Sequence, residues 1–500
     1  MNFTTPIFLF VFFPITVLIF LGIDMMERRK ILYYFLVKFR IKDLSLITMS
    51  LMFYMWACFD DVIKFLIYML GVWIAGICIC HNSRFYVNVF EQKEGEENCA
   101  SKKIKVSVFI LSFAISLILL CLIHFKYTSL LTTIWNYLWR DTQVKESILA
   151  PVGISFITFS AISYLVDIYR RDIRGGNFID CMLYLSFFPK VISGPIVLWK
   201  DFAPMLEKQL ITSEGVVSGL NRIMIGFAKK LILADQFGLC ISRVSVSGTD
   251  VMTGWGIAFL YMLQIYYDFS GYSDIAIGLA RLLGFEFQEN FHFPYRSTSI
   301  SEFWRRWHIS LGRWFREYVY FPLGGSRRGE HRAICNVAVV FAVTGIWHGA
   351  GWNYLLWGGI NGAMVILERL LKEKKFYQKQ PVISKWFVTM SVTFFCWQFF
   401  RFPSFSESLE WLKLMFGAFR QQHIYFSWRY YFDAQIITLA VIGAVGAVLP
   451  GDAGIQRWYQ RFSGKKAGFL IQEVGLMLLF MIAVLFMINS TYSPFIYFQY

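Results

Sequence analysis

The sequence has little charge for its length. Asp, Glu, Lys and Arg make up 16% of its 500 residues, whereas about 25% is usual in soluble proteins. Apolar residues make up 57% and gather in long runs, which excludes a soluble enzyme and a disordered protein. Proline is sparse, with 12 residues, and glycine, with 36, is no more frequent than usual, which excludes collagen-like and low-complexity chains. The runs are continuous and about twice the roughly 10 residues of a membrane β-barrel strand. The sequence therefore predicts an all-α polytopic integral membrane protein.

Several chemical signatures are missing as well. The nine cysteines are scattered, and the one close pair, Cys78 and Cys80, has no further ligands beside it. Neither a disulfide framework nor a metal site is expected from this spacing. The chain also lacks His-Glu-x-x-His, Walker, Gly-x-Gly-x-x-Gly and Gly-x-Ser-x-Gly motifs. These absences argue against metalloprotease, nucleotide-binding and serine-hydrolase chemistry, and no tightly bound cofactor is expected.

The apolar runs predict a single membrane-embedded domain over residues 1–500. We expect about 10 to 12 transmembrane helices, with re-entrant and amphipathic helices among them. The first run, residues 1–23, has neither a preceding basic cluster nor a small-residue cleavage site, so it is expected to stay as the first helix. Arg28, Arg29 and Lys30 follow it. Because cytoplasmic loops are rich in Lys and Arg, this order predicts an extracytoplasmic N-terminus and also accounts for the net charge of +15.

The C-terminal third can be oriented by the same rule. Basic clusters around Lys375 and Lys465 mark two cytoplasmic loops, and the apolar runs 383–400 and 434–450 separate them. Two crossings return the chain to the side of the membrane from which it started, so the two runs are consistent with both loops being cytoplasmic. The last run, 468–489, then leads outward, so the C-terminus is also predicted to be extracytoplasmic.

Polar groups interrupt the apolar run 251–284. The interruption reads Tyr267-Asp268-Phe269-Ser270-Gly271-Tyr272-Ser273-Asp274. Carboxylates and hydroxyls at membrane depth are costly unless they face a polar interior. They form either a hydrogen-bonded contact between helices around Gly271 or a contact with substrate, and the sequence leaves both interpretations open.

An amphipathic helix is predicted over residues 302–319. At about 100° per residue, aromatic residues that include Trp307 fall on one face and charged residues that include Arg305 fall on the other. His308 lies in the middle of the aromatic face. Such a helix lies at the membrane interface or dips into the protein, and the pattern leaves open whether His308 is a core residue or a functional one.

A second histidine, His348, ends a predicted apolar helix that begins near Ala333. At about 1.5 Å per residue it lies roughly 22 Å along that helix, within a hydrocarbon core about 30 Å thick. Gly349 and Gly351 then break the helix. An imidazole at that depth is expected to be functional. A neutral imidazole in an apolar pocket can deprotonate a hydroxyl, and acyl transfer from a thioester to an alcohol needs such a base.

An ordered set of motifs resembles the membrane-bound O-acyltransferase (MBOAT) family. The resemblance is densest over residues 184–358 and is greatest to the bacterial branch that O-acetylates alginate or transfers D-alanine to teichoic acid, with the length favouring the first type. It implies a helical bundle around a central tunnel. The motifs are Tyr267–Asp274, Phe293-Pro294-Tyr295-Arg296-Ser297, Glu302-Phe303-Trp304-Arg305-Arg306-Trp307-His308-Ile309-Ser310-Leu311, Pro322-Leu323-Gly324-Gly325 and Trp347-His348-Gly349-Ala350.

The resemblance also implies roles for residues and partners. His348 is the expected catalytic histidine, and His308 is the expected second polar residue, a position that is Asn or His in many members. The acyl group, expected to be acetyl, comes from a cytoplasmic thioester donor, expected to be acetyl-CoA. It passes to a cell-envelope or extracellular polysaccharide through an extracytoplasmic esterase-like partner, and no nucleic acid is involved. The candidates for substrate or tunnel contact are Asp268, Ser270, Tyr272, Arg305, Trp307, Trp347 and Asn353.

Alternatives remain open at this stage. Within the family, the alternative is D-alanyl transfer to teichoic acid from a carrier protein, and outside it, a polytopic transporter or flippase. The uncharged aromatic tail 493–500 is either an anchor in the outer interface or an acyl relay. The relay interpretation rests on resemblance to a C-terminal motif of envelope-acylation systems and makes the Tyr500 phenol the acyl acceptor.

Overall fold

The computed structural model describes residues 3–89, 97–139, 150–173, 175–245, 248–349, 351–418 and 426–489. The described residues form helices and no β-strand, apart from one isolated bridge between Thr249 and Phe426. Five of the described helical segments are long and apolar enough to cross a membrane. The prediction of an all-α polytopic membrane protein is confirmed, and the total number of crossings stays a prediction. The five segments are Phe8–Arg28, Phe59–His81, Lys105–Thr128, Ala434–Gly451 and Lys466–Asn489.

The chain divides into two compact units. The first comprises residues 1–220 and 276–288, and the second comprises residues 221–275 and 289–500. The long helix α12 (Val251–Leu282) contributes residues to both units. Whether the chain behaves as one domain, as its sequence predicts, stays a prediction.

The first unit is built from the N-terminal helices. Its core includes Trp199, whose indole meets the rings of Tyr164 and Tyr184 edge-on at centroid distances of 5.0 and 5.1 Å. A buried ion pair, Lys42 Nζ to Asp24 Oδ1 at 2.6 Å, joins α1 to α3. The elements are η1 (Phe8–Phe12), α1 (Phe13–Arg28), α2 (Tyr33–Lys38), α3 (Ile41–Ala57), η2 (Phe59–Asp61), α4 (Val62–Val89), α5 (Glu97–Trp139), α6 (Ile154–Arg170), α7 (Phe178–Ser186), α8 (Phe188–Val191), α9 (Trp199–Glu207) and most of α10 (Ser213–Phe227).

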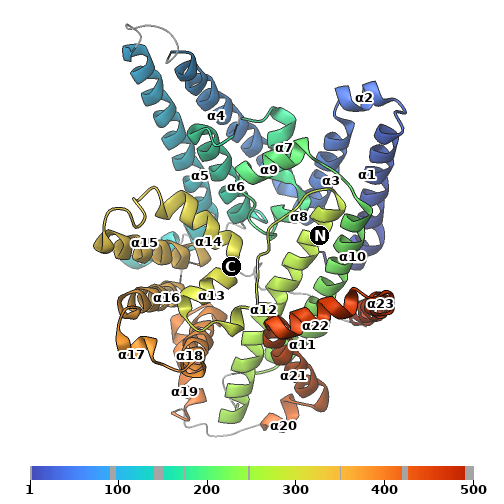
Figure 1. The fold of residues 1–500 in the computed structure, drawn as a ribbon. Helices are drawn as coiled ribbons and strands as arrows, with labels where there is room; N and C mark the ends of the chain where they lie inside the picture. The colour runs from blue at the N-terminus through green and yellow to red at the C-terminus, as the bar shows by residue number, and fades with distance from the viewer. Residues whose placement is uncertain are drawn as a thin grey trace. The chain divides into compact units, whose positions relative to one another are not determined.

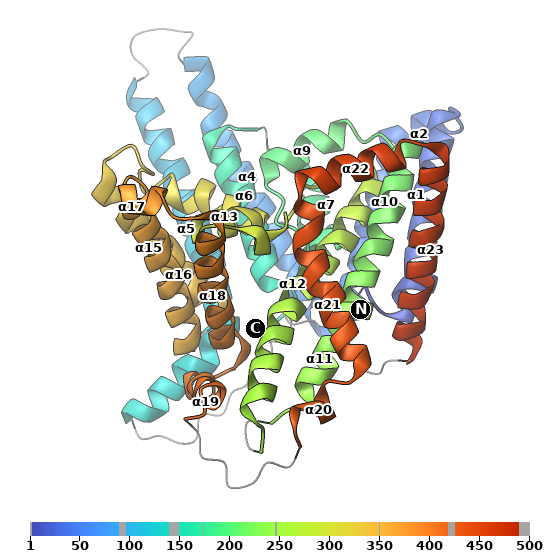
Figure 2. The same ribbon diagram turned by 60° about the horizontal axis from the view of Figure 1, so that its bottom comes forward.

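The second unit carries both predicted functional histidines. Three of its helices, α15, α16 and α18, lie side by side (Figures 1 and 2). Its elements after α10 are η3 (Ala228–Ala234), α11 (Asp235–Ser242), η4 (Pro294–Arg296), α13 (Ile300–Arg306), α14 (Ile309–Phe315), η5 (Arg316–Tyr320), α15 (Glu330–His348), α16 (Trp352–Leu371), α17 (Lys375–Gln378), α18 (Val382–Arg401), α19 (Phe405–Met415), α20 (Trp428–Tyr431), α21 (Ala434–Val448), η6 (Leu449–Gly451), α22 (Ala453–Ser463) and α23 (Lys466–Asn489).

Glycines allow α15 and α16 to approach closely just before His348. A Cβ atom on Gly345 would lie 2.7 Å from the carbonyl oxygen of Tyr354, and one on Gly358 would lie 2.6 Å from that of Phe341. Neither contact leaves room for a side chain without a shift of backbone. The close packing therefore fixes the C-terminal turn of α15 against the helix that follows it.

The predicted continuous helix over residues 302–319 is wrong. The helix ends at Arg306, and a new one, α14, begins at Ile309. His308 between them is in the left-handed region, with φ 45° and ψ 53°. Asn290 accounts for the break because its main-chain and side-chain oxygens accept the N–H groups of Ile309 and Ser310, at 3.0 and 3.2 Å. The first N–H groups of a helix have no partner within it, so an outside acceptor stabilises a helix start at this point.

Helix α13 is tied to α16 at its own start. Ser299 Oγ accepts the N–H of Glu302 at 3.0 Å, as an N-cap residue does. The Glu368 carboxylate of α16 accepts the N–H of Ile300, and it also accepts the N–H and O–H of Ser301 at 2.8 and 2.7 Å. A carboxylate is favourable there because the N-terminus of a helix carries a partial positive charge.

Candidate active site

His348 is the last residue of α15 and lies inside an aromatic enclosure. The side chains of three helices form it: the indole of Trp347 lies 4.5 Å from the imidazole centroid, and the rings of Trp357 and Phe400 meet it edge-on at 5.0 Å. The residue is 4% exposed. Gly349 follows in an extended conformation and ends the helix, as its sequence predicts. The imidazole is thus held where the chain leaves α15.

Asn353 helps to build this enclosure. Its Nδ2 donates to the carbonyl oxygens of Phe399 and Phe402 at 3.1 and 2.6 Å, and these belong to the C-terminal end of α18. Carbonyls at the end of a helix lack partners within the helix, so the amide holds the end of α18 in place. The anchored turn includes Phe400, which borders His348. A contact of Asn353 with substrate stays a prediction.

His308 occupies the break between α13 and α14 and is 2% exposed. Its imidazole meets the ring of Phe269 edge-on at 4.6 Å, and its Nδ1 lies 3.1 Å from Asn290 Oδ1. It lies outside the five candidate membrane spans. Burial lowers the pKa of His308 to about 3, because the charged imidazolium would lose its hydration. His308 is therefore neutral at physiological pH.

A chain of aromatic contacts connects the surroundings of the two histidines. Trp307, next to His308, lies 4.9 Å from Trp397 of α18 between ring centroids. Trp397 in turn lies 6.2 Å from Trp357, which contacts His348. Both predicted histidines thus lie next to members of one buried aromatic cluster, His348 in contact with Trp357 and His308 directly after Trp307 in the chain, although they are 40 residues apart in the sequence.

The polar interruption of α12 contains a buried ion-pair cluster. Lys230 Nζ lies 2.7 Å from Asp268 Oδ1 and 2.5 Å from Asp235 Oδ1, and all three side chains are almost fully buried. A Cβ atom on Gly271 would lie 2.9 Å from the carbonyl oxygen of Gly226, so α12 and α10 approach closely here. These contacts match the helix–helix interpretation of the motif. A role of Asp268 in substrate contact stays a prediction.

The other candidates differ in their surroundings. Ser270 and Tyr272 are each 1% exposed, and within the described part of the chain Ser270 Oγ has no hydrogen-bond partner. Trp347 is also buried and borders His348. Arg305 is exposed and lines a polar cavity of about 620 Å³, together with basic residues such as Lys372. The structure therefore does not bring Arg305 into the aromatic cluster.

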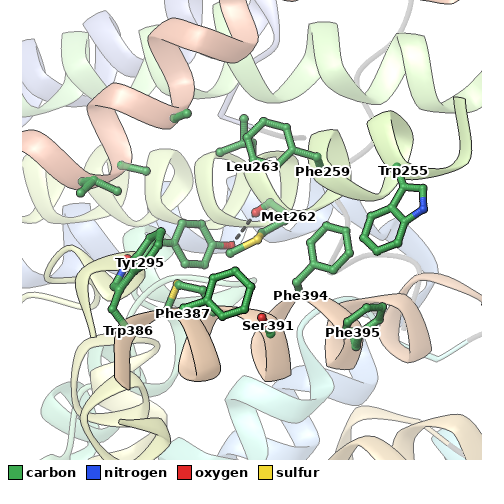
Figure 3. Close-up of a pocket in the computed structure, with 14 residues that line it drawn as sticks. Trp255, Phe259, Met262, Leu263, Tyr295, Trp386, Phe387, Ser391, Phe394 and Phe395 are labelled. Atoms are coloured by element: carbon green, nitrogen blue, oxygen red, sulfur yellow. Dashed lines mark hydrogen bonds between the residues drawn. The ribbon is translucent and has the colours of Figure 1, made fainter. Parts of the chain in front are cut away.

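An apolar cavity of about 610 Å³ lies beside this cluster. Figure 3 shows α12 and α18 on its two sides, with Tyr295 and Trp386 towards one end and Trp255 towards the other. The Tyr295 hydroxyl donates to the carbonyl oxygen of Met262 at 2.5 Å. On its other side, Tyr295 stacks on Trp307. The lining suits a hydrocarbon chain, and neither His308 nor His348 is among its lining residues.

Comparison with known proteins decides the family. Residues 106–409 match the family model of MBOAT, the membrane-bound O-acyltransferase family. The chain belongs to this family. The resemblance noted in its motifs is confirmed, and the protein is an O-acyltransferase of the multi-pass membrane type.

Several curated relatives in this family share long stretches with the chain. The probable alginate O-acetylase AlgI of Pseudomonas putida is 31% identical over the full length of both chains. The peptidoglycan O-acetyltransferase of Helicobacter pylori is 32% identical over 59% of this chain and 62% of its own length. The teichoic acid D-alanyltransferase of Streptococcus thermophilus is 30% identical over 47% of this chain and 60% of its own.

Sequence reasoning missed two residues that organise this MBOAT site. Asn290 contacts His308 and caps α14, yet it lies in an irregular segment with no periodic pattern. Lys230 and the adjacent Lys229 interrupt an apolar run, and charged residues inside such a run are the signal that could have found it. Tyr500, the predicted acyl acceptor, lies outside the described residues.

Proposed function

We propose that the protein transfers an acetyl group from a cytoplasmic thioester donor, acetyl-CoA, to a polysaccharide of the cell envelope or extracellular matrix. Family membership supports the O-acyltransferase chemistry. The full-length similarity to relatives named alginate O-acetylases supports the acetyl group and the polysaccharide. In this proposal both termini lie outside the cytoplasm, and a separate extracytoplasmic esterase-like protein passes the acetyl group on.

The chemistry assigned to His348 is general-base catalysis. Its neutral imidazole removes the proton of the acceptor hydroxyl, whose oxygen attacks the thioester carbonyl carbon. The tetrahedral intermediate collapses by breaking the C–S bond, and the imidazolium returns the proton to the leaving thiolate. The products are the O-acyl ester and free coenzyme A, and the histidine is regenerated.

The aromatic enclosure of His348 is the observation that supports this assignment most directly. Rings of Trp347, Trp357 and Phe400 surround the imidazole. A general base must be neutral before it accepts the proton, and the proposal assigns that form to the resting imidazole. The enclosure also keeps out water that would hydrolyse the thioester.

The test of this role is the substitution of His348. We expect His348→Ala and His348→Gln to abolish acetylation of envelope polymer, since loss of a general base costs about 10²–10⁴-fold in rate. Polymer-bound acetyl would be measured by mass spectrometry, with membrane protein levels compared by immunoblot. His331→Ala is the matched control, because His331 is an exposed histidine on the same helix. Wild-type acetylation by either folded His348 variant would contradict the assignment.

The acyl group is tested separately. The Pseudomonas putida relative named an alginate O-acetylase matches over the whole chain, whereas the Streptococcus thermophilus D-alanyltransferase matches over 47% of it, which favours acetyl. We expect the purified protein to release free thiol from acetyl-CoA and not from a D-alanyl carrier protein. The opposite preference would replace acetyl transfer by D-alanyl transfer and leave the role of His348 unchanged.

A further inference from the structure

Asn290 lies at the centre of a hydrogen-bonded group that includes His308. The residue is fully buried, in the segment between α12 and η4. Its Oδ1 accepts the N–H of Ser310 at 3.2 Å and the O–H of Ser310 at 2.8 Å. The same Oδ1 lies 3.1 Å from His308 Nδ1, and its Nδ2 donates to Ser273 Oγ at 3.0 Å. Every polar atom of this side chain is therefore engaged.

The contact with Ser310 fixes which way the amide of Asn290 points. A backbone N–H can only donate, so the atom that faces the N–H of Ser310 is the amide oxygen and not the amide nitrogen. That oxygen can only accept. His308 Nδ1 faces the same oxygen at 3.1 Å and also lies 3.4 Å from Ser310 Oγ. Because the Ser310 O–H already donates to Asn290 Oδ1, Nδ1 carries the hydrogen that faces this oxygen. In a neutral imidazole one nitrogen carries the hydrogen and the other carries the lone pair, so Nε2 is the basic nitrogen.

The segment that carries Asn290 is itself anchored to its neighbours. Asn290 reaches α12 through Ser273, and the preceding residue, Glu289, forms an ion pair with Arg222 of α10. Arg222 also bonds Asp274 of α12 at 2.7 Å. Asn290 is thus tied to α12 through its own side chain and to α10 through the residue before it, which limits its freedom to follow His308 if the imidazole turns. Because the amide is anchored, it determines which ring nitrogen of His308 carries the hydrogen.

We propose that Asn290 is a positioning residue that holds neutral His308 as the Nδ1–H tautomer and leaves the lone pair on Nε2. The role given to His308 in the reaction rests on the proposed acyl transfer, whereas the assignment of the tautomer rests only on the hydrogen bonds of Asn290. A lone pair on Nε2 can accept a hydrogen bond from a hydroxyl group and cannot donate one to the carbonyl oxygen of a thioester. His308 therefore orients the acyl acceptor, whereas His348 removes its proton.

Nitrogen NMR of the full-length protein in lipid bilayers tests the tautomer directly. With ¹⁵N-labelled histidine, the protonated and unprotonated ring nitrogens have widely separated chemical shifts. The chain has seven histidines, and the signal of His308 is the one lost in His308→Asn. We expect Nδ1 of His308 to be protonated and Nε2 to be unprotonated at neutral pH. Protonated Nε2 with unprotonated Nδ1 in the wild-type protein would overturn the proposal before any other variant is made.

Variants of Asn290 test whether this residue causes the tautomer. Asn290→Ala removes the acceptor that faces Nδ1, so the Nε2–H tautomer of His308 should become populated. Asn290→Asp keeps an acceptor and should keep Nδ1 protonated. Ser273→Ala is the matched control, because it removes a hydrogen bond of Asn290 on the side away from His308, and it should leave the tautomer unchanged. An unaltered His308 signal in Asn290→Ala would overturn the proposal.

Kinetics separate this role from a general loss of structure. We expect Asn290→Ala to lower kcat about 10- to 100-fold, as misorientation at a catalytic site does, with KM for acetyl-CoA unchanged. Equal kcat values for Asn290→Ala and the wild type would contradict a positioning role. The NMR result does not depend on which group removes the proton, so failure of the His348 assignment and failure of this proposal appear in different experiments.

Discussion

Substitution of Lys230 by methionine should destabilise the protein severely. Its Nζ lies 2.5 Å from Asp235 Oδ1 and 2.7 Å from Asp268 Oδ1, and the side chain of Lys230 is 1% exposed. Removal of one partner from a buried ion pair costs about 3–5 kcal/mol, because a buried charge is left without compensation. Here two carboxylates share one ammonium group. We therefore expect Lys230→Met to fall at the upper end of that range.

The assay is retention of folded protein on heating. Purified variants in detergent would be heated in steps, and the monodisperse fraction would be measured by size-exclusion chromatography, since unfolding of such proteins is commonly irreversible. Asp235→Asn is the matched control because it leaves a neutral Lys230–Asp268 pair, and only a small loss is expected. The triple variant Lys230→Met/Asp235→Asn/Asp268→Asn, which has no net charge at the cluster, should recover much of the loss. A Lys230→Met protein as heat-resistant as the wild type would refute the reasoning.

Three further predictions concern the site and the topology. His308→Asn should retain more acetylation activity than His308→Ala in the polymer assay, because an amide N–H can still donate to Asn290, and equal loss in both would favour direct proton transfer by His308. A reporter fused after Tyr500 should be accessible from outside the cell, and reporters inserted near Lys375 or Lys465 only from inside; a cytoplasmic C-terminus would overturn the charge-based topology. Tyr500→Phe keeps an aromatic anchor but removes the phenol, so loss of polymer acetylation at normal protein levels supports an acyl relay, and full acetylation reduces the tail to an anchor.

The sequence predicts best those features that local patterning determines. Long apolar runs predict the membrane helices, and two glycines after His348 predict the end of α15 at that residue. The helix begins at Glu330 rather than near Ala333, because the preceding basic loop contributes its last residues to the first turn. Such shifts are small, and they leave the burial of His348 unaffected.

Features that depend on contacts distant in sequence could not be predicted. The break at His308 follows from Asn290, 18 residues earlier, whose oxygens cap α14. The apolar periodicity continues across the break, so the pattern favours one helix. Likewise, whether Asp268 faces substrate or a lysine depends on how α12 packs against η3, and only the structure shows Lys230 beside it.

The contact of Glu368 with the start of α13 limits how the protein can move. Helix α13 leads directly into His308, and α16, which carries Glu368, follows directly after the helix that ends at His348. Hydrogen bonds to a charged group contribute about 1.5–3 kcal/mol each, and Glu368 accepts them from Ile300 and Ser301. Opening a path between α13 and α16 would break them all. A motion that keeps these bonds must therefore carry the start of α13, which leads into His308, together with α16.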